Sequence, residues 1–223
     1  MKPILLATKR KVFYWSVLAV GVIVIACIGY RILCRHLALQ ISDVGYSFTP
    51  GEVLLLDSHT FRGTIVHLTN SRTEYAHVVL VSEGGQNPLL IHADPQQGCI
   101  AETLADYLTG NLVLGLAVLR PSASDKQIVE ALNFAKEAVD KKTPFNLSFH
   151  YCNGNGLYCT ELVLQAYSHA GMPLLSNIRQ GEIIRPERLL ASRYLSLAFE
   201  VNAGMDCVHK SAFLPMDFEA SSK

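Results

Sequence analysis

The sequence predicts an α+β domain with an antiparallel sheet, preceded by one hydrophobic N-terminal helix. Three observations indicate this class: nineteen residues without charge at positions 12–30, two β-branched runs around a glycine-containing turn at 74–95, and helical patterns at 122–142 and from Cys159 to Gly171. The chain has 223 residues, and about 190 of them follow the hydrophobic run. That length suits a single globular domain.

The hydrophobic run is just long enough to cross a bilayer, and three basic residues at positions 9–11 precede it. Basic residues keep that end of a span in the cytoplasm. We therefore expect a cytoplasmic N-terminus at 1–11, a signal anchor or transmembrane helix at 12–34, and a membrane-anchored domain on the periplasmic or extracellular side.

Two other interpretations of the hydrophobic run stay open. Val24-Ile25-Ala26-Cys27 resembles a lipobox, which would make the chain a lipoprotein acylated at Cys27 after cleavage. A buried core helix is the other alternative, although the basic flank and the lack of polar positions are unusual for one.

Charge and cysteine spacing exclude several classes of protein. The formal net charge is zero, so we expect no nucleic-acid partner. No CxxC or HExxH spacing occurs, so we expect no metal site and no cofactor. Two of the six cysteines lie in or beside the hydrophobic run, and the spacing of the rest matches no regular disulfide scaffold: Cys99, Cys152, Cys159 and Cys207.

Turn residues divide the predicted domain, residues 45–223, into short elements, with a C-terminal extension from about 176. A Pro-Gly turn enters a strand within 48–58, and 63–71 is ambiguous between helix and strand. The remaining expected elements are a short helix at 102–110, a buried strand at 111–121 stopped by proline, the long helix at 122–142 and another helix at 185–192.

The hairpin at 74–95 brings two histidines together. If its turn centres on Gly84 and Gly85, partner residue numbers sum to about 169, and His77 faces His92 with Cβ atoms roughly 5 Å apart. One imidazole can then act as a base while the other fixes its tautomer. A solvated pair on a polar sheet face is the alternative, and Asp94, two residues further on, is a second candidate for the orienting group.

Cys159 lies between a glycine-rich loop and an amphipathic helix. A thiolate at a helix N-terminus is stabilised by the helix dipole and by free N–H groups, which predicts a thiol pKa lowered toward neutrality. The same N–H groups can receive an oxyanion. An inert core cysteine and a disulfide with Cys152 stay open, and the flanking Tyr75 and Tyr158 are either auxiliary site residues or packing residues.

Three segments resemble the permuted papain-fold cysteine hydrolases of the YiiX and YaeF type, within the NlpC-like superfamily: TNSRTEYAHVVLV, LLIHADPQQGC and PFNLSFHYCNGNGLYCTELVLQAY. The resemblance covers about residues 48–172. It implies a circularly permuted papain-like fold, with Cys159 as nucleophile and His77 as general base. His92 falls where that family commonly has a glutamate, and a second histidine there resembles relatives of lecithin:retinol acyltransferase.

We therefore expect a membrane-tethered cysteine hydrolase that cleaves an amide, such as a cell-wall peptide, through a Cys-His-His constellation and a thioester. A lipid acyl hydrolase or acyltransferase of the lecithin:retinol acyltransferase type stays open. So does a catalytically inactive envelope module that binds peptide or lipid. The choice between His92 and Asp94 as third catalytic residue is open as well.

Overall fold

The computed structural model describes residues 20–22, 24–25, 29, 39–40, 44–58 and 75–202. The chain forms two compact units, residues 1–38 and 39–223. The described residues of the first unit are helical, and its apolar side chains, such as Val22 and Ile25, are exposed. None of the helices in the described ranges is long and apolar enough to span a membrane. The predicted span at 12–34 lies mostly outside those ranges.

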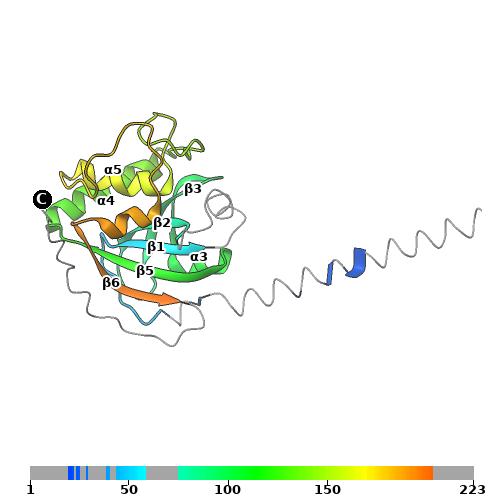
Figure 1. The fold of residues 1–223 in the computed structure, drawn as a ribbon. Helices are drawn as coiled ribbons and strands as arrows, with labels where there is room; N and C mark the ends of the chain where they lie inside the picture. Colours follow the sequence, from blue (N-terminus) through cyan, green and yellow to red (C-terminus); the bar gives the residue numbers. More distant parts are fainter. Residues whose placement is uncertain are drawn as a thin grey trace, which may run out of the picture. The chain divides into compact units, whose positions relative to one another are not determined.

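The second unit is a mixed α+β domain with a six-stranded antiparallel sheet in the order β4-β3-β2-β1-β5-β6. The strands are β1 (Val53–Ser58), β2 (His77–Glu83), β3 (Leu89–Asp94), β4 (Gly98–Thr103), β5 (Val113–Pro121) and β6 (Leu195–Asn202). The helices are α3 (Leu104–Gly110), α4 (Asp125–Asp140), α5 (Cys159–His169) and the 3-10 helix η2 (Pro186–Ala191). Figure 1 shows α4 and α5 together on one side of the sheet.

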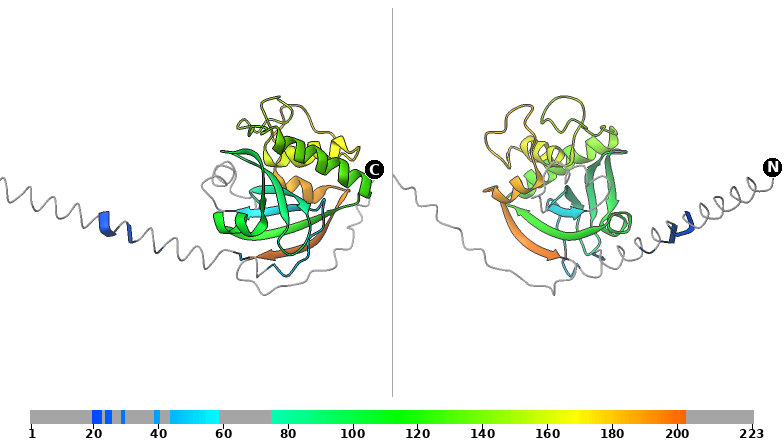
Figure 2. Two further views of the ribbon diagram at one scale, coloured as in Figure 1. Left: turned by 180° about the vertical axis from the view of Figure 1, so that it is seen from behind. Right: turned by 45° about the vertical axis from the view of Figure 1, so that its right-hand side comes forward.

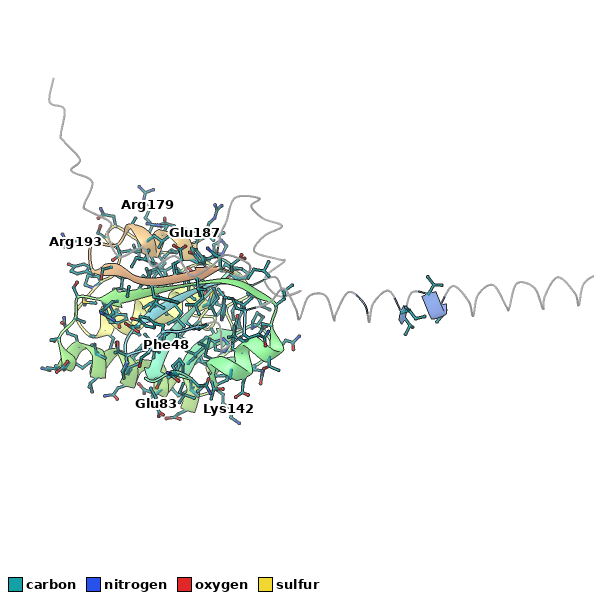
Figure 3. The ribbon with its side chains drawn as sticks, turned by 90° about the horizontal axis from the view of Figure 1, so that it is seen from below. Phe48, Glu83, Lys142, Arg179, Glu187 and Arg193 are labelled. Atoms are coloured by element: carbon teal, nitrogen blue, oxygen red, sulfur yellow. The ribbon has the colours of Figure 1, made fainter. Side chains whose placement is uncertain are left out.

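Strand alternation divides the core between the two faces of the sheet. Leu55 and Val78 point to the face that α4 and α5 cover. The views in Figure 2 show these two helices on the same side of the sheet. Leu54 and Val79 point to the other face, where α3 and Phe48 pack, and Figure 3 shows Phe48 inside the domain. These side chains are fully buried or nearly so, and each contributes about 1.5–3 kcal/mol relative to an exposed position.

Local sequence signals explain the elements that the sequence predicts. The strand within 48–58 is β1, the strand at 111–121 is β5, and the helix at 122–142 is α4. Helix α4 begins at a capping box in which Ser124 and Gln127 satisfy each other's backbone N–H groups. The predicted helix at 185–192 is the 3-10 helix η2, whose first residue is a proline.

Two strands differ from the sequence-based prediction. Residues 98–103 form β4, and the predicted helix at 102–110 begins only at Leu104, because the Thr103 side chain caps it by accepting from the Asp106 N–H. Glu102 therefore lies in a strand. Beyond residue 176 the chain supplies β6, which pairs with β5 at the edge of the sheet. The ambiguous segment at 63–71 lies outside the described residues.

The register of the β2–β3 hairpin also differs from the prediction. Leu80 pairs with Ile91, so partner numbers sum to 171 rather than about 169. The reason is a wider connection: the register shifts between Val81 and Glu83, and Gly85 pairs with Phe48 instead of closing a two-residue turn. Continued along the strands, this register makes His77 and His92 diagonal rather than direct neighbours on one face.

Candidate active site

Three side chains from neighbouring strands form a hydrogen-bonded line. His77 begins β2, and its Nε2 lies 3.0 Å from Nδ1 of His92 on β3. The other ring nitrogen of His92, Nε2, lies 2.8 Å from Oε1 of Glu102 on β4. His92 is only 2% exposed, whereas the Glu102 side chain is 28% exposed. The predicted contact between the two imidazoles is therefore present, and a carboxylate extends it.

Glu102 is the member of this line that sequence reasoning missed. In the β3–β4 hairpin His92 pairs with Ile100 and Leu90 with Glu102, which makes Glu102 a diagonal neighbour of His92 on the same face. The signal for this hairpin was the segment Asp94-Pro-Gln-Gln-Gly, because aspartate and glycine favour a tight turn. A second hairpin predicted at this turn would have placed Glu102 next to His92.

Asp94 closes the β3–β4 turn. Its Oδ1 accepts hydrogen bonds from the backbone N–H groups of Gln96 and Gln97, at 2.8 and 2.9 Å. The partner of His92 Nε2 is Glu102, not Asp94. The geometry therefore favours Glu102 over Asp94 as the carboxylate that acts through the imidazole pair.

Tyr107 on α3 packs against both imidazoles. Its ring is stacked on His77 with centroids 5.7 Å apart, and it meets the ring of His92 edge-on at 5.4 Å. Burial raises the pKa of Tyr107, a hydrogen bond with Ser58 lowers it, and the charge of Cys159 raises it further. Tyr107 therefore links the histidine line to the cysteine.

Cys159 is the first residue of α5, as the sequence predicts. The backbone N–H groups of Val78, Thr160 and Cys159 itself lower the pKa of its thiol, and the sulfur lies 4.0 Å from Oγ1 of Thr160. Val78 directly follows His77 in β2. The packing of α5 on β2 therefore brings Cys159 to the strand that carries His77.

The predicted fall in the pKa of the Cys159 thiol is wrong. Burial, which leaves the residue 7% exposed, raises that pKa and outweighs the hydrogen bonds that lower it. Burial, followed by the charge of His92, also holds the pKa of His77 well below its usual value. Both shifts favour the uncharged forms, a neutral thiol at Cys159 and a neutral imidazole at His77.

The chain has counterparts among known proteins. A family model described as permuted papain-like amidase enzyme, YaeF/YiiX, C92 family, matches residues 47–188. The chain belongs to this family. It is therefore a cysteine hydrolase of the amidase type. The wider assignment to the NlpC-like superfamily stays a prediction.

A solved structure shows the fold independently of the family model. The crystal structure of metalloprotein YiiX from Escherichia coli O157:H7 is 18% identical, covers 70% of this chain and 97% of its own, and has a TM-score of 0.52. Likeness at that identity shows the fold alone. A search of curated proteins found no match.

A buried polar network holds the loop before Cys159 in place. Glu161, in the first turn of α5, is only 1% exposed. Its carboxylate accepts from the Cys152 backbone N–H at 2.7 Å, from the Gln165 amide at 2.9 Å and from the Asn146 amide at 3.2 Å. Through Cys152 and Asn146, Glu161 therefore anchors the loop before Cys159.

Backbone conformation shows how closely this loop is packed. Gly156 has φ of 103°, and a Cβ there would collide with the carbonyl of Pro144. Phe149 and Cys152 have φ of 57° and 54°, which side chains rarely adopt. Gly156 is therefore needed because the chain approaches Pro144 closely on its way to the cysteine, whereas Gly154 has open space around it and a φ of 80°.

The two flanking tyrosines have structural contacts. The hydroxyl of Tyr158 accepts from the backbone N–H of Ile184 at 3.3 Å, and its ring packs edge-on against Phe149. The hydroxyl of Tyr75 donates to Glu200 Oε1 on β6 at 2.9 Å. Auxiliary roles for these two residues in catalysis stay predictions.

The cysteines that the structure describes carry free thiols: Cys99, Cys152 and Cys159. A disulfide between Cys152 and Cys159, one of the alternatives open from the sequence, is therefore wrong. Within the described ranges, no three His, Cys, Asp or Glu side chains are grouped so that they could hold a metal ion. Cys27, Cys34 and Cys207 lie outside those ranges.

Proposed function

We propose that the protein hydrolyses an amide through a thioester on Cys159, with His77 as general base and His92 as the partner that orients it. The observation that carries the proposal is the position of Tyr107, whose ring is stacked on His77 with centroids 5.7 Å apart and whose pKa is raised by burial and also by the nearby charge of Cys159. Helix α5 also packs against β2, so the nucleophile lies against the strand that carries the base.

The neutral resting pair suggests how the first step proceeds. His77 takes the thiol proton as the sulfur bonds to the amide carbonyl carbon, so no ionised thiol needs to accumulate beforehand. The N–H groups of Cys159 and Thr160, at the start of α5, can donate to the oxyanion that forms. The C–N bond then breaks, and the amine leaves with the proton that His77 held.

Water completes the reaction. With His77 again neutral, it removes a proton from water, whose oxygen attacks the thioester carbon. The C–S bond breaks, the thiol recovers its proton and the carboxylic acid leaves. The balance is one amide and one water consumed, with one amine and one acid formed.

We propose further that the domain is tethered to the membrane and faces the periplasm or the extracellular side. The charge-free run at 12–30 behind a basic flank supports this placement. Protease added to intact cells expressing the full chain should digest the domain under conditions that leave a cytoplasmic marker whole. Digestion only after the cytoplasmic membrane is permeabilised would contradict the placement. Incorporation of labelled fatty acid, lost in Cys27→Ser, would instead identify a lipoprotein.

The substrate is tested with the full chain and a matched Cys159→Ala variant. Cell-wall muropeptides and phospholipids are offered separately, and release of new amino groups or of fatty acids is measured. Amide cleavage that Cys159→Ala abolishes is the expected result. Fatty-acid release alone would favour the lipid acyl hydrolase or acyltransferase. Saturable binding without turnover, in a protein whose thiol resists alkylation, would favour the inactive binding module.

A further inference from the structure

We infer that Glu102 is a positioning residue that sets the protons on both imidazoles and so makes Nδ1 of His77 the atom that takes the thiol proton. This inference rests on the proposed function, because it concerns the same base. It assigns a task to a residue outside the Cys-His-His constellation.

The argument begins at the carboxylate. An ionised carboxylate only accepts hydrogen bonds, so the 2.8 Å contact with Glu102 requires a proton on Nε2 of His92. A neutral imidazole has one N–H, which leaves Nδ1 of His92 with a lone pair. The 3.0 Å contact between Nδ1 of His92 and Nε2 of His77 then requires the proton to be on Nε2 of His77. Nδ1 of His77 is therefore the free acceptor.

Ring position and proton position have different causes at this site. Tyr107 packs against both rings, and the strand ladders fix their backbones, so the rings stay in place without the carboxylate. Nothing in that packing distinguishes the two tautomers of either ring. The choice of tautomer depends on the acceptor at the end of the line, which is Glu102.

Adding one proton to the two imidazoles reverses the direction of the hydrogen bond between them. A doubly protonated His92 keeps its Nε2–H on Glu102 and donates from Nδ1 to Nε2 of His77, so His77 must carry its own proton on Nδ1. Nδ1 of His77 then already carries a proton and cannot take one from the thiol, although the His77 ring is uncharged. Cys159 on α5, Tyr107 on α3 and Asp94 on β3 are the other titratable groups around this site.

The test uses the full chain with isotope-labelled histidine, and ¹⁵N spectra that separate protonated from bare ring nitrogens. His77→Gln and His92→Gln assign the signals. Glu102→Ala removes the acceptor, Glu102→Gln keeps a neutral acceptor, and Glu83→Gln is the matched control, an exposed glutamate on β2 that Figure 3 labels. Alkylation of Cys159 by iodoacetamide is followed across pH in each variant, so no substrate is needed.

The wild-type chain should carry protons on Nε2 of both histidines and none on either Nδ1. Glu102→Ala should mix the tautomers of His77 and slow alkylation at neutral pH by about tenfold, a smaller loss than removing the base itself. Glu102→Gln should fall between wild type and Glu102→Ala, and Glu83→Gln should match wild type.

Two results would overturn the inference: a proton on Nδ1 of His77 in the neutral wild-type site, or unchanged spectra and alkylation in Glu102→Ala. Failure of the proposed function gives a different pattern. If His77→Gln leaves the alkylation profile unchanged, His77 is not the base of Cys159, whatever the spectra show of Glu102.

Discussion

The two halves of the site are built in different ways. The base side consists of His77, His92 and Glu102. These come from three adjacent strands, and their geometry follows from the antiparallel pairing of those strands. The nucleophile side, Cys159 and the loop before it, depends on a buried carboxylate and on a backbone with left-handed residues such as Cys152. One half is secondary structure, and the other is a loop held by polar contacts.

This difference predicts different responses to mutation. A side chain on the base side can be replaced without disturbing the ladder, so its loss should change proton transfer and leave folding intact. A side chain in the loop network leaves buried polar groups without partners, so its loss should change stability first. The following variants test this contrast in order of decreasing effect.

The base gives the largest expected effect. His77→Gln should lower kcat/KM by about 10²–10⁴-fold, because it removes the group that accepts the thiol proton. The melting temperature should change little, and His92→Gln should cost less activity than His77→Gln. Steady-state kinetics and thermal unfolding measured on the same preparations check both expectations. A large fall in melting temperature with unchanged kcat/KM would show that His77 has a structural role and is not the base.

Glu161 tests the other half. Glu161→Ala removes the acceptor of three hydrogen bonds and should lower the free energy of unfolding by about 1–3 kcal/mol, measured by urea denaturation. Glu137→Ala is the matched control, because Glu137 is an exposed glutamate whose ion pair with Lys141 contributes little. Equal effects from the two variants would show that the network does not hold the loop.

The pH dependence of the free energy of unfolding should distinguish His77 from exposed histidines. Because the pKa of His77 is lowered in the folded domain, the unfolded chain binds a proton there first, and stability falls as pH falls below about 6.5. The loss is at most about 1.4 kcal/mol per pH unit. His77→Gln should flatten this dependence, and His150→Gln, at an exposed position, should keep it. Urea denaturation at pH 7 and pH 5 measures the difference.

Tyr75 should give the smallest effect. Tyr75→Phe removes the hydrogen bond to Glu200 and should lower the free energy of unfolding by about 1 kcal/mol, with kcat/KM unchanged. If Tyr75 instead stabilises an oxyanion, kcat should fall while the stability change stays the same. The two readouts therefore decide between a packing residue and an auxiliary catalytic residue.

The sequence alone was sufficient for features set by neighbouring residues. A cysteine after a glycine-rich loop and before an amphipathic pattern predicted the start of α5, and two β-branched runs around Gly84 and Gly85 predicted the β2–β3 hairpin. The contact between His77 and His92 followed from that hairpin, although its register did not. The register depends on Phe48, which is distant in the chain and pairs with Gly85.

The tertiary structure alone decided the rest. Glu102 has the character of a helix-start residue in sequence, and only the pairing of β4 with β3 places its carboxylate on His92. The pKa of Cys159 was mispredicted because a helix N-terminus is a local feature, whereas burial depends on what packs around the thiol. Local pattern therefore determined which residues could react, and long-range packing determined their protonation and their partners.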